Sequence, residues 1–227
     1  KCFISNGGLA DLTTVYATTD PSRGVRGLSC FLVPKGNPGI SGGKKERKMG
    51  VRASVTSEVI LSDCRVPAED RLGEEGQGFK IAMITLDKAR VNVASGSVGI
   101  ARAAFEAAVD YARQRVQFGR PIAENQAVQF MLADMSMDIE AGRLMYMKAA
   151  WMETQGVPFT REAAYAKTFC SDMAMRVTTD VVQVFGGDGY MRDYPVEKYM
   201  RDAKINQIWD GTNQIQRMVM ARSILGK

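Results

Sequence analysis

Three glycine-bearing loops have the composition of ligand-binding segments. They read RVQFG at 115–119, QVFGGDG at 183–189 and WDGTNQ at 209–214. Each also has a structural explanation, because GGDG is a typical helix C-cap and Thr212 is a typical N-cap for a following helix. None of them matches a P-loop, and no GxGxxG follows a strand, so the sequence does not support a Rossmann dinucleotide site.

The side chains available for chemistry are limited, because the chain has no histidine. This excludes Ser-His-Asp and Cys-His catalysis and every histidine-ligated metal site. The four cysteines form no CxxC pair, so we expect reduced thiols and no metal site; they are Cys2, Cys30, Cys64 and Cys170. Any proton transfer must therefore use Asp, Glu, Lys, Tyr or Cys.

The composition is that of an ordinary globular protein, with 227 residues of which 45% are hydrophobic and 24% charged. The net charge of +5 comes from basic and acidic residues that are scattered along the chain. The dense basic patch at 44–48 is typical of a solvated loop rather than of a nucleic-acid groove. No apolar stretch approaches the roughly 20 residues that cross a bilayer. We therefore expect that the protein binds no nucleic acid and does not insert into a membrane. The absence of paired cysteines, noted above, favours a reducing compartment.

The first part of the chain has the pattern of antiparallel β-structure. Short β-rich runs alternate with turns of Gly, Pro, Asn and Asp, which predicts strands at 2–5, 13–19, 28–34 and 58–62. Four such strands are enough for a small sheet. The first run reads as a strand already under way and the chain lacks an initiator Met, so we expect a β domain that is truncated at its N-terminus.

The pattern after Gly78 changes to long segments with apolar residues three and four apart, which is typical of helices. Helices are predicted at 79–115, 125–155, 160–185, 196–208 and 213–225. Long helices joined by short loops favour an antiparallel four-helix bundle. The predicted fold class is thus α+β, with a partial β domain at 1–75 and a helical bundle domain at 76–227.

Taken together and in order, these segments resemble the acyl-CoA dehydrogenase family, of the short- to medium-chain type, over essentially the whole chain. The matching segments are FISNG (3–7), GLSCFLV (27–33), KMGVR (48–52), VP (66–67), GQGF (76–79), LDKAR (86–90), RVQFG (115–119), LADM (132–135), QVFGGDG (183–189), RDAKI (201–205), GT (211–212) and IQR (215–217). The family normally has an N-terminal helical domain before the position that matches Lys1, and we expect this domain to be absent here.

The resemblance implies an FAD site assembled between the β domain, the bundle and a neighbouring subunit. Phe3 stands where the family usually has a tryptophan against the flavin ring, and Ser5 where it usually has a threonine that hydrogen-bonds near flavin N5. The residues that match contacts to the rest of FAD are Arg115, Phe118, Gln126, Gln183, Gly186, Gly187, Thr212 and Gln214. Guanidinium and backbone N–H groups suit an anionic phosphate.

The resemblance also implies where the substrate binds and how it reacts. Asp87, Arg90 and Gly211 match substrate-binding positions, the first two for the pantetheine and adenine parts of CoA. A carboxylate base removes the α-proton of the thioester while the β-hydrogen leaves as hydride to flavin N5. The base precedes the Gly-Thr pair, where this chain has Asp210 in place of the usual glutamate.

This replacement withdraws the carboxylate by one methylene, about 1.5 Å of chain, and a misplacement of roughly 1 Å can cost on the order of 100-fold in rate. Three interpretations remain open. Asp210 is the base for an unusual substrate, since some family members that act on alicyclic acyl-CoAs also have aspartate here. Alternatively the base lies on the first long helix just before its arginine, a position that is Ala89 in this chain. Finally, the chain is catalytically weak or inert.

The leading hypothesis is therefore a flavoprotein oxidoreductase of fatty acid metabolism that desaturates an acyl-CoA and passes electrons to an electron-transferring flavoprotein. The same residues also permit the reductase direction. The family resemblance implies a homotetramer or homodimer in the bacterial cytoplasm, which we favour, or in the mitochondrial matrix. The rival hypothesis is a non-catalytic fragment that serves only as an oligomerisation scaffold.

Overall fold

The computed structural model describes residues 1–226, and the chain divides into two compact units, Lys1–Leu86 and Asp87–Lys227. Helix α1 (Gly78–Gln114) begins in the first unit and continues into the second. The combination of small antiparallel sheets and a helical C-terminal part confirms the predicted α+β class.

The first unit holds two three-stranded antiparallel sheets. In one, β1 (Ile4–Ser5) pairs with β5 (Thr56–Leu61), which also pairs with β4 (Ile40–Lys45). In the other, β3 (Leu28–Pro34) lies between β2 (Leu12–Thr18) and β6 (Arg71–Leu72). The buried residues of β2 and β3 include Val15, Cys30 and Val33.

The four predicted strands are divided between the two sheets, and strands β4 and β6 were missed. Strand β4 has the sequence ISGGKK, and its glycines and lysines have low β propensity. Gly42 is nevertheless needed, since a Cβ there would lie 2.8 Å from the Cα of Gly8. This close approach of two backbones can be seen only in the folded chain.

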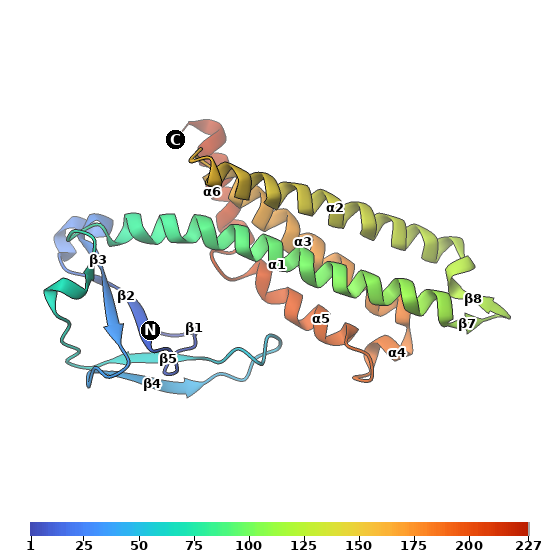
Figure 1. Cartoon of the computed structure of the whole chain (residues 1–227), viewed down its shortest axis with the longest axis horizontal. Coiled ribbons are helices and arrows are strands. Elements are labelled where there is room, and N and C mark those ends of the chain that lie inside the picture. Colours follow the sequence, from blue (N-terminus) through green and yellow to red (C-terminus); the bar gives the residue numbers. More distant parts are fainter. Residues whose placement is uncertain (227) are drawn as a thin grey trace. The chain divides into compact units, whose positions relative to one another are not determined.

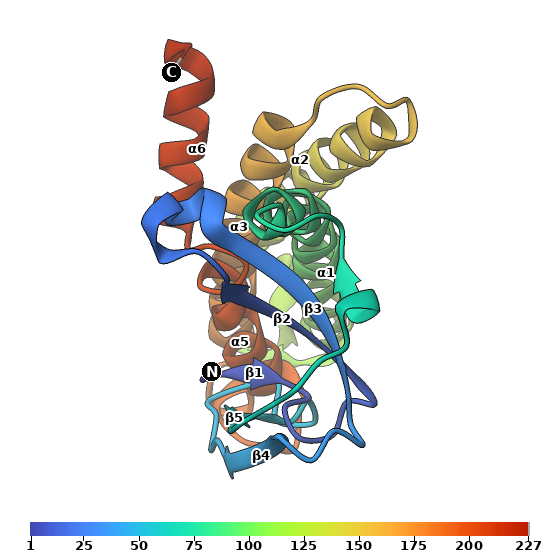
Figure 2. The same ribbon diagram turned by 90° about the vertical axis from the view of Figure 1, so that its left-hand side faces the viewer.

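The second unit is built from long helices that lie side by side (Figures 1 and 2). Helices α1, α2 (Gln126–Thr154) and α3 (Thr160–Phe185) run in alternating directions, and α5 (Val196–Ala203) packs against α3. The core is continuous across these four helices. The α1 contribution is mostly alanine, whose small side chain lets helices approach closely; the alanines are Ala94, Ala101, Ala104, Ala108 and Ala112.

The helix boundaries follow the local end signals in the sequence. Helix α3 and helix α6 (Asn213–Leu225) have the predicted bounds, and those of α1 and α2 differ by one residue at each end. Gly186 ends α3 at φ +61°, as its C-cap position predicts. Two details differ: a short helix α4 (Gly187–Tyr190) follows, and the predicted helix at 196–208 is α5 followed by a 3₁₀ turn, η4 (Lys204–Gln207).

The connection between α1 and α2 is a small hairpin of β7 (Val116–Gln117) and β8 (Arg120–Pro121), followed by a 3₁₀ turn, η3 (Ile122–Glu124). Two further 3₁₀ segments, η1 (Pro21–Gly27) and η2 (Ala68–Asp70), belong to the first unit. Within residues 1–226, no helix combines the length and the apolar composition that crossing a bilayer requires.

Candidate active site

The turn at Asp210 and Gly211 joins η4 to α6 and has an unusual backbone. Both residues have positive φ, +52° for Asp210 and +88° for Gly211. Aspartate tolerates this left-handed region better than most residues, and glycine adopts it freely. A Cβ on Gly211 would lie only 2.7 Å from Nε2 of Gln216. Position 211 therefore requires glycine for two separate reasons.

The carbonyl groups of this turn are bound by side chains from three helices. Gln216 on α6 donates from Nε2 to the oxygen of Asp210 at 3.2 Å and to that of Gly211 at 3.0 Å. Lys167 on α3 donates to the Gly211 oxygen at 2.9 Å. Arg90 on α1 makes a longer contact of 3.5 Å from Nε to the Asp210 oxygen. The tertiary structure thus holds the turn in place.

The side chain of Asp210 is less constrained than its backbone. The residue is half-buried, and the structure gives its carboxylate no hydrogen bond or ion pair among residues 1–226. Burial raises the pKa of Asp210 above its ordinary value, while the charges of Lys167 and Arg90 act in the opposite direction. A partly desolvated carboxylate with no partner of its own has the properties of a general base.

Arg90 and Asp87, which were predicted to contact the substrate, interact with each other in this structure. Nη1 of Arg90 lies 2.7 Å from Oδ1 of Asp87, and the arginine is 4% exposed. The other oxygen of Asp87 accepts a hydrogen bond of 2.5 Å from the Thr160 hydroxyl. The pair therefore ties the start of α3 and the Asp210 turn to α1.

A cavity of about 240 Å³ lies where α1 and α3 end, beside the β7–β8 hairpin. It brings together Arg115, Gly186 and Gly187, three of the residues predicted to bind the cofactor. The guanidinium of Arg115 lies 3.7 Å from the Asp188 carboxylate. A glycine-lined cleft with an arginine suits a phosphate-bearing ligand.

The other cofactor-binding candidates near this end are exposed. Phe118 stands in the turn of the β7–β8 hairpin and is 98% exposed, while Gln126 is the exposed first residue of α2. Gln183 is exposed on the last turn of α3. The structure places Phe3 and Ser5 in the first unit, where Phe3 is exposed with a φ of +56° and Ser5 ends β1.

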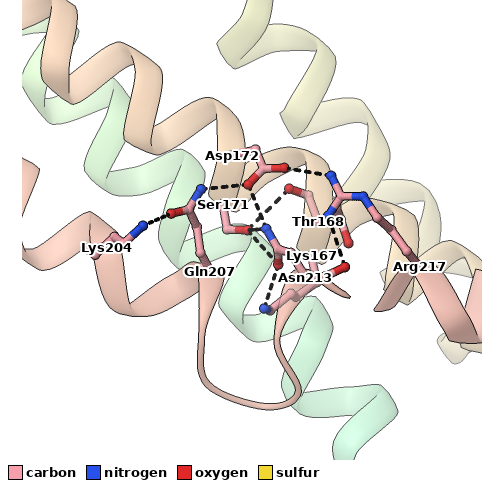
Figure 3. A network of polar contacts seen from close by, with 8 residues as sticks. All are labelled: Lys167, Thr168, Ser171, Asp172, Lys204, Gln207, Asn213 and Arg217. Carbon is pink, nitrogen blue, oxygen red and sulfur yellow. Dashed lines mark hydrogen bonds and ion pairs between the residues drawn. The ribbon is translucent and has the colours of Figure 1, made fainter. Parts of the chain in front are cut away.

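Thr212 and Gln214 line a second cavity, of about 420 Å³, beside the start of α6. The Thr212 hydroxyl accepts the backbone N–H of Ile215 at 3.4 Å, which confirms its predicted role as a helix cap. The opposite wall of this cavity carries Asp172, which accepts hydrogen bonds from Gln207 and Asn213 and pairs with Arg217 (Figure 3).

Sequence analysis missed the residues behind the turn, namely Lys167, Ser171, Asp172, Asn213 and Gln216. One signal was available: Lys167 is spaced three or four residues from Ala163, Cys170 and Ser171, on the small-residue face of α3. A lysine on the buried face of an amphipathic helix needs a polar partner. The identity of that partner depends on tertiary structure.

Comparison with known proteins gives consistent matches. Residues 76–225 match the family model described as acyl-CoA dehydrogenase, C-terminal domain, and residues 1–64 match the model of the middle domain. A relative from Megasphaera elsdenii, named short-chain-specific acyl-CoA dehydrogenase, is 54% identical over 99% of this chain and 59% of its own length. The cyclohex-1-ene-1-carbonyl-CoA dehydrogenase of Syntrophus aciditrophicus is 51% identical over 99% of this chain and 55% of its own length.

The chain is also similar to solved structures. One structure, described as the electron transferring flavoprotein of Acidaminococcus fermentans, contains a chain that is 54% identical and matches with a TM-score of 0.99. The match covers 100% of this chain and 60% of that one. The chain thus spans less than two thirds of each of these proteins.

Proposed function

Because the chain belongs to the acyl-CoA dehydrogenase family, we propose that the intact protein catalyses the α,β-dehydrogenation of an acyl-CoA thioester with Asp210 as the base. The observation that carries this proposal is the state of the Asp210 carboxylate. It is half-buried and without a partner among residues 1–226, its pKa is raised by burial, and its backbone is held by three helices.

The chemical roles of the chain's own residues follow from this placement. Asp210 takes the α-proton of the thioester, and its desolvation strengthens it as a base. The cations of Lys167 and Arg90 lie on the backbone side of the turn, where they favour the ionised form that accepts the proton. FAD, when bound, supplies the acceptor for the hydride that leaves the β-carbon.

The residues that line the two cavities support the binding of such a cofactor. Arg115, Gly186 and Gly187 offer a guanidinium and an open backbone to a phosphate, and Thr212 and Gln214 offer polar groups at the second cavity. We assign Phe118, Gln126 and Gln183 to the same function, together with Phe3 and Ser5 on the flavin side. The roles of Asp87, Arg90 and Gly211 toward the CoA moiety remain predictions.

For the substrate, we propose an acyl-CoA with a ring at the reacting carbons. The carboxylate of aspartate ends one methylene short of that of glutamate, which leaves room at the α-carbon. A relative at 51% identity is named as acting on cyclohex-1-ene-1-carbonyl-CoA, which supports this class. The relative at 54% identity is named as short-chain specific, so a straight short acyl chain is the second candidate.

The electron acceptor is proposed to be an electron-transferring flavoprotein. This rests on the 54% identical chain in the structure of such a system from Acidaminococcus fermentans. We also propose that the protein is a homotetramer or homodimer, because α2 exposes a series of large apolar side chains. They are Phe130, Met137, Leu144, Met147 and Trp151, and exposed apolar surface of this extent is typical of interfaces.

The test is a panel of acyl-CoA substrates assayed with a dye acceptor on the intact protein and on two variants of Asp210. We expect cyclohexanecarbonyl-CoA, which has the α-proton that the reaction removes, to react faster than butyryl-CoA. Asp210→Asn should lose about 100- to 10,000-fold in rate, the usual contribution of a general base. Asp193→Asn, which changes an exposed aspartate, is the matched control.

Asp210→Glu sharpens the substrate assignment, since it moves the carboxylate by about 1.5 Å. We expect it to favour butyryl-CoA over the ring substrate. Full activity of Asp210→Asn would remove the base assignment. A colourless protein that takes up no FAD would instead favour the scaffold hypothesis.

A further inference from the structure

Lys167 is a completely buried lysine, with 0% exposure, in the middle of α3. Lysine is almost never fully buried without partners, because its ammonium group is costly to remove from water. Here Nζ donates to the carbonyl oxygen of Gly211 at 2.9 Å and to Oδ1 of Asn213 at 2.8 Å. Both acceptors belong to the segment that begins with Asp210.

The two acceptors lie on either side of Thr212, so the ammonium group links the end of the turn to the first residue of α6. Asn213 is itself anchored, since its Nδ2 donates to Ser171 at 2.9 Å and to Asp172 at 2.8 Å (Figure 3). Lys167 therefore connects the turn to a network that is fixed to α3. A non-glycine residue such as Asp210 keeps a left-handed backbone only when its surroundings impose it.

The charges around Lys167 also connect it to Asp210. Asp210 and Asp172 favour its protonated form, whereas Arg90 on α1 disfavours it. Burial is the largest influence and lowers the pKa of Lys167 to about 8. In return, the charge of Lys167 opposes the rise in the pKa of Asp210 that burial causes. The two groups thus influence each other's protonation.

We infer that Lys167 is a positioning residue for the reaction, whose ammonium group fixes the Asp210–Gly211 turn and keeps the Asp210 carboxylate ionised and in place. The inference rests on the proposed function of Asp210 as the base. Lys167 acts through the turn and does not itself touch the reacting carbons.

The inference predicts how kcat/KM depends on pH, both on the basic side of the profile (the basic limb) and on its acid side (the acid limb). In the unmodified protein, kcat/KM should fall as pH rises through about 8, because the ammonium loses its proton and its hold on the turn weakens. In Lys167→Met that fall should disappear. The acid limb of the same variant should move to higher pH, because the pKa of Asp210 rises when the neighbouring positive charge is removed.

The variants separate positioning from folding. Lys167→Met should reduce kcat/KM by about 10- to 100-fold, the usual result of misplacing a reacting group by roughly 1 Å. Lys167→Arg keeps the charge at all these pH values, so its acid limb should match that of the parent and its basic limb near pH 8 should be absent. Lys80→Met, which changes an exposed lysine near the start of α1, is the matched control and should behave as the parent.

A measurement without substrate tests the coupling directly. The pKa of Lys167, followed by NMR of isotope-labelled lysine, should fall in Asp210→Asn, because the coupling between two sites is reciprocal. If Asp210→Asn is inactive while Lys167→Met keeps the rate and both limbs of the parent, the inference on Lys167 is wrong and the proposed function stands. If Asp210→Asn is fully active, the proposed function fails first.

If Lys167→Met does not yield folded protein, the inference is tested by comparing the pH profiles of the parent and of Lys167→Arg. The parent should lose activity near pH 8 and Lys167→Arg should not. A parent profile that is flat between pH 7 and about 9 would overturn the inference.

Discussion

Two turns in the helical unit have nearly the same pair of positive φ angles and very different surroundings. Phe118 and Gly119 have φ values of +54° and +81°, and Asp210 and Gly211 have +52° and +88°. The first pair closes the two-residue β7–β8 hairpin, where Phe118 is 98% exposed. The second pair is bound by side chains of α1, α3 and α6.

The comparison shows two ways in which a protein can hold residues at positive φ. In a two-residue hairpin, positive φ at both positions matches the twist of the paired strands, so local pairing is sufficient. The Asp210 turn has no such pairing, and its carbonyl groups depend on donors that are far away in the sequence. A change in those distant residues should therefore disturb the second turn and leave the first unchanged.

The largest effect on stability is expected from placing alanine at the glycine of each turn. Gly211→Ala adds a Cβ that would lie 2.7 Å from Gln216 Nε2 and also forces a non-glycine residue to φ +88°. Gly119→Ala meets nothing within 4 Å and bears the conformational cost alone. We expect losses in unfolding free energy of about 3 kcal/mol and about 1 kcal/mol respectively.

Denaturant unfolding of the two variants measures this difference. Equal losses would mean that the contact with Gln216 costs nothing, and that the surroundings of the Asp210 turn adjust freely. If Asp210 is the base as proposed, the rate of dehydrogenation by the intact protein should also fall with Gly211→Ala, because the turn that carries Asp210 must shift.

A smaller effect is expected from Gln216→Leu, which keeps the size of a fully buried side chain. The carbonyl groups of Asp210 and Gly211 each lose one of two donors, although the change also removes Oε1 of Gln216, which is buried and without a partner among the described residues. We expect a net loss of about 1 to 2 kcal/mol.

The control is Gln155→Leu, at the exposed end of α2, which should change stability by about 0.5 kcal/mol or less. A Gln216→Leu variant as stable as this control would show that Lys167 and Arg90 hold the turn without it.

The same contrast explains which features could be predicted from the sequence. The bounds of α3 and α6 follow from local signals, such as the glycine at 186 and the cap at Thr212. Strand β4 was missed because its glycines have low β propensity, and the close approach of Gly8 that requires Gly42 comes from far away in the sequence. Asp210 was proposed as the base through the family resemblance at Gly211 and Thr212, and that role stays a prediction. Lys167 and Gln216 were missed because their partners are fixed only by packing.

The smallest effect is expected at the exposed turn, where the side chain of Phe118 is almost fully exposed and so adds little packing energy to offset the cost of a left-handed backbone. Asparagine adopts this region more readily than phenylalanine. Phe118→Asn should therefore stabilise the protein by about 0.5 to 1 kcal/mol, measured as a rise in the denaturant midpoint. If Phe118 contacts FAD as proposed, the same variant should bind FAD more weakly, as measured by flavin fluorescence on dilution. A gain in stability together with a loss of affinity would show that phenylalanine at this position serves binding rather than folding, whereas no change in affinity would remove Phe118 from the proposed site.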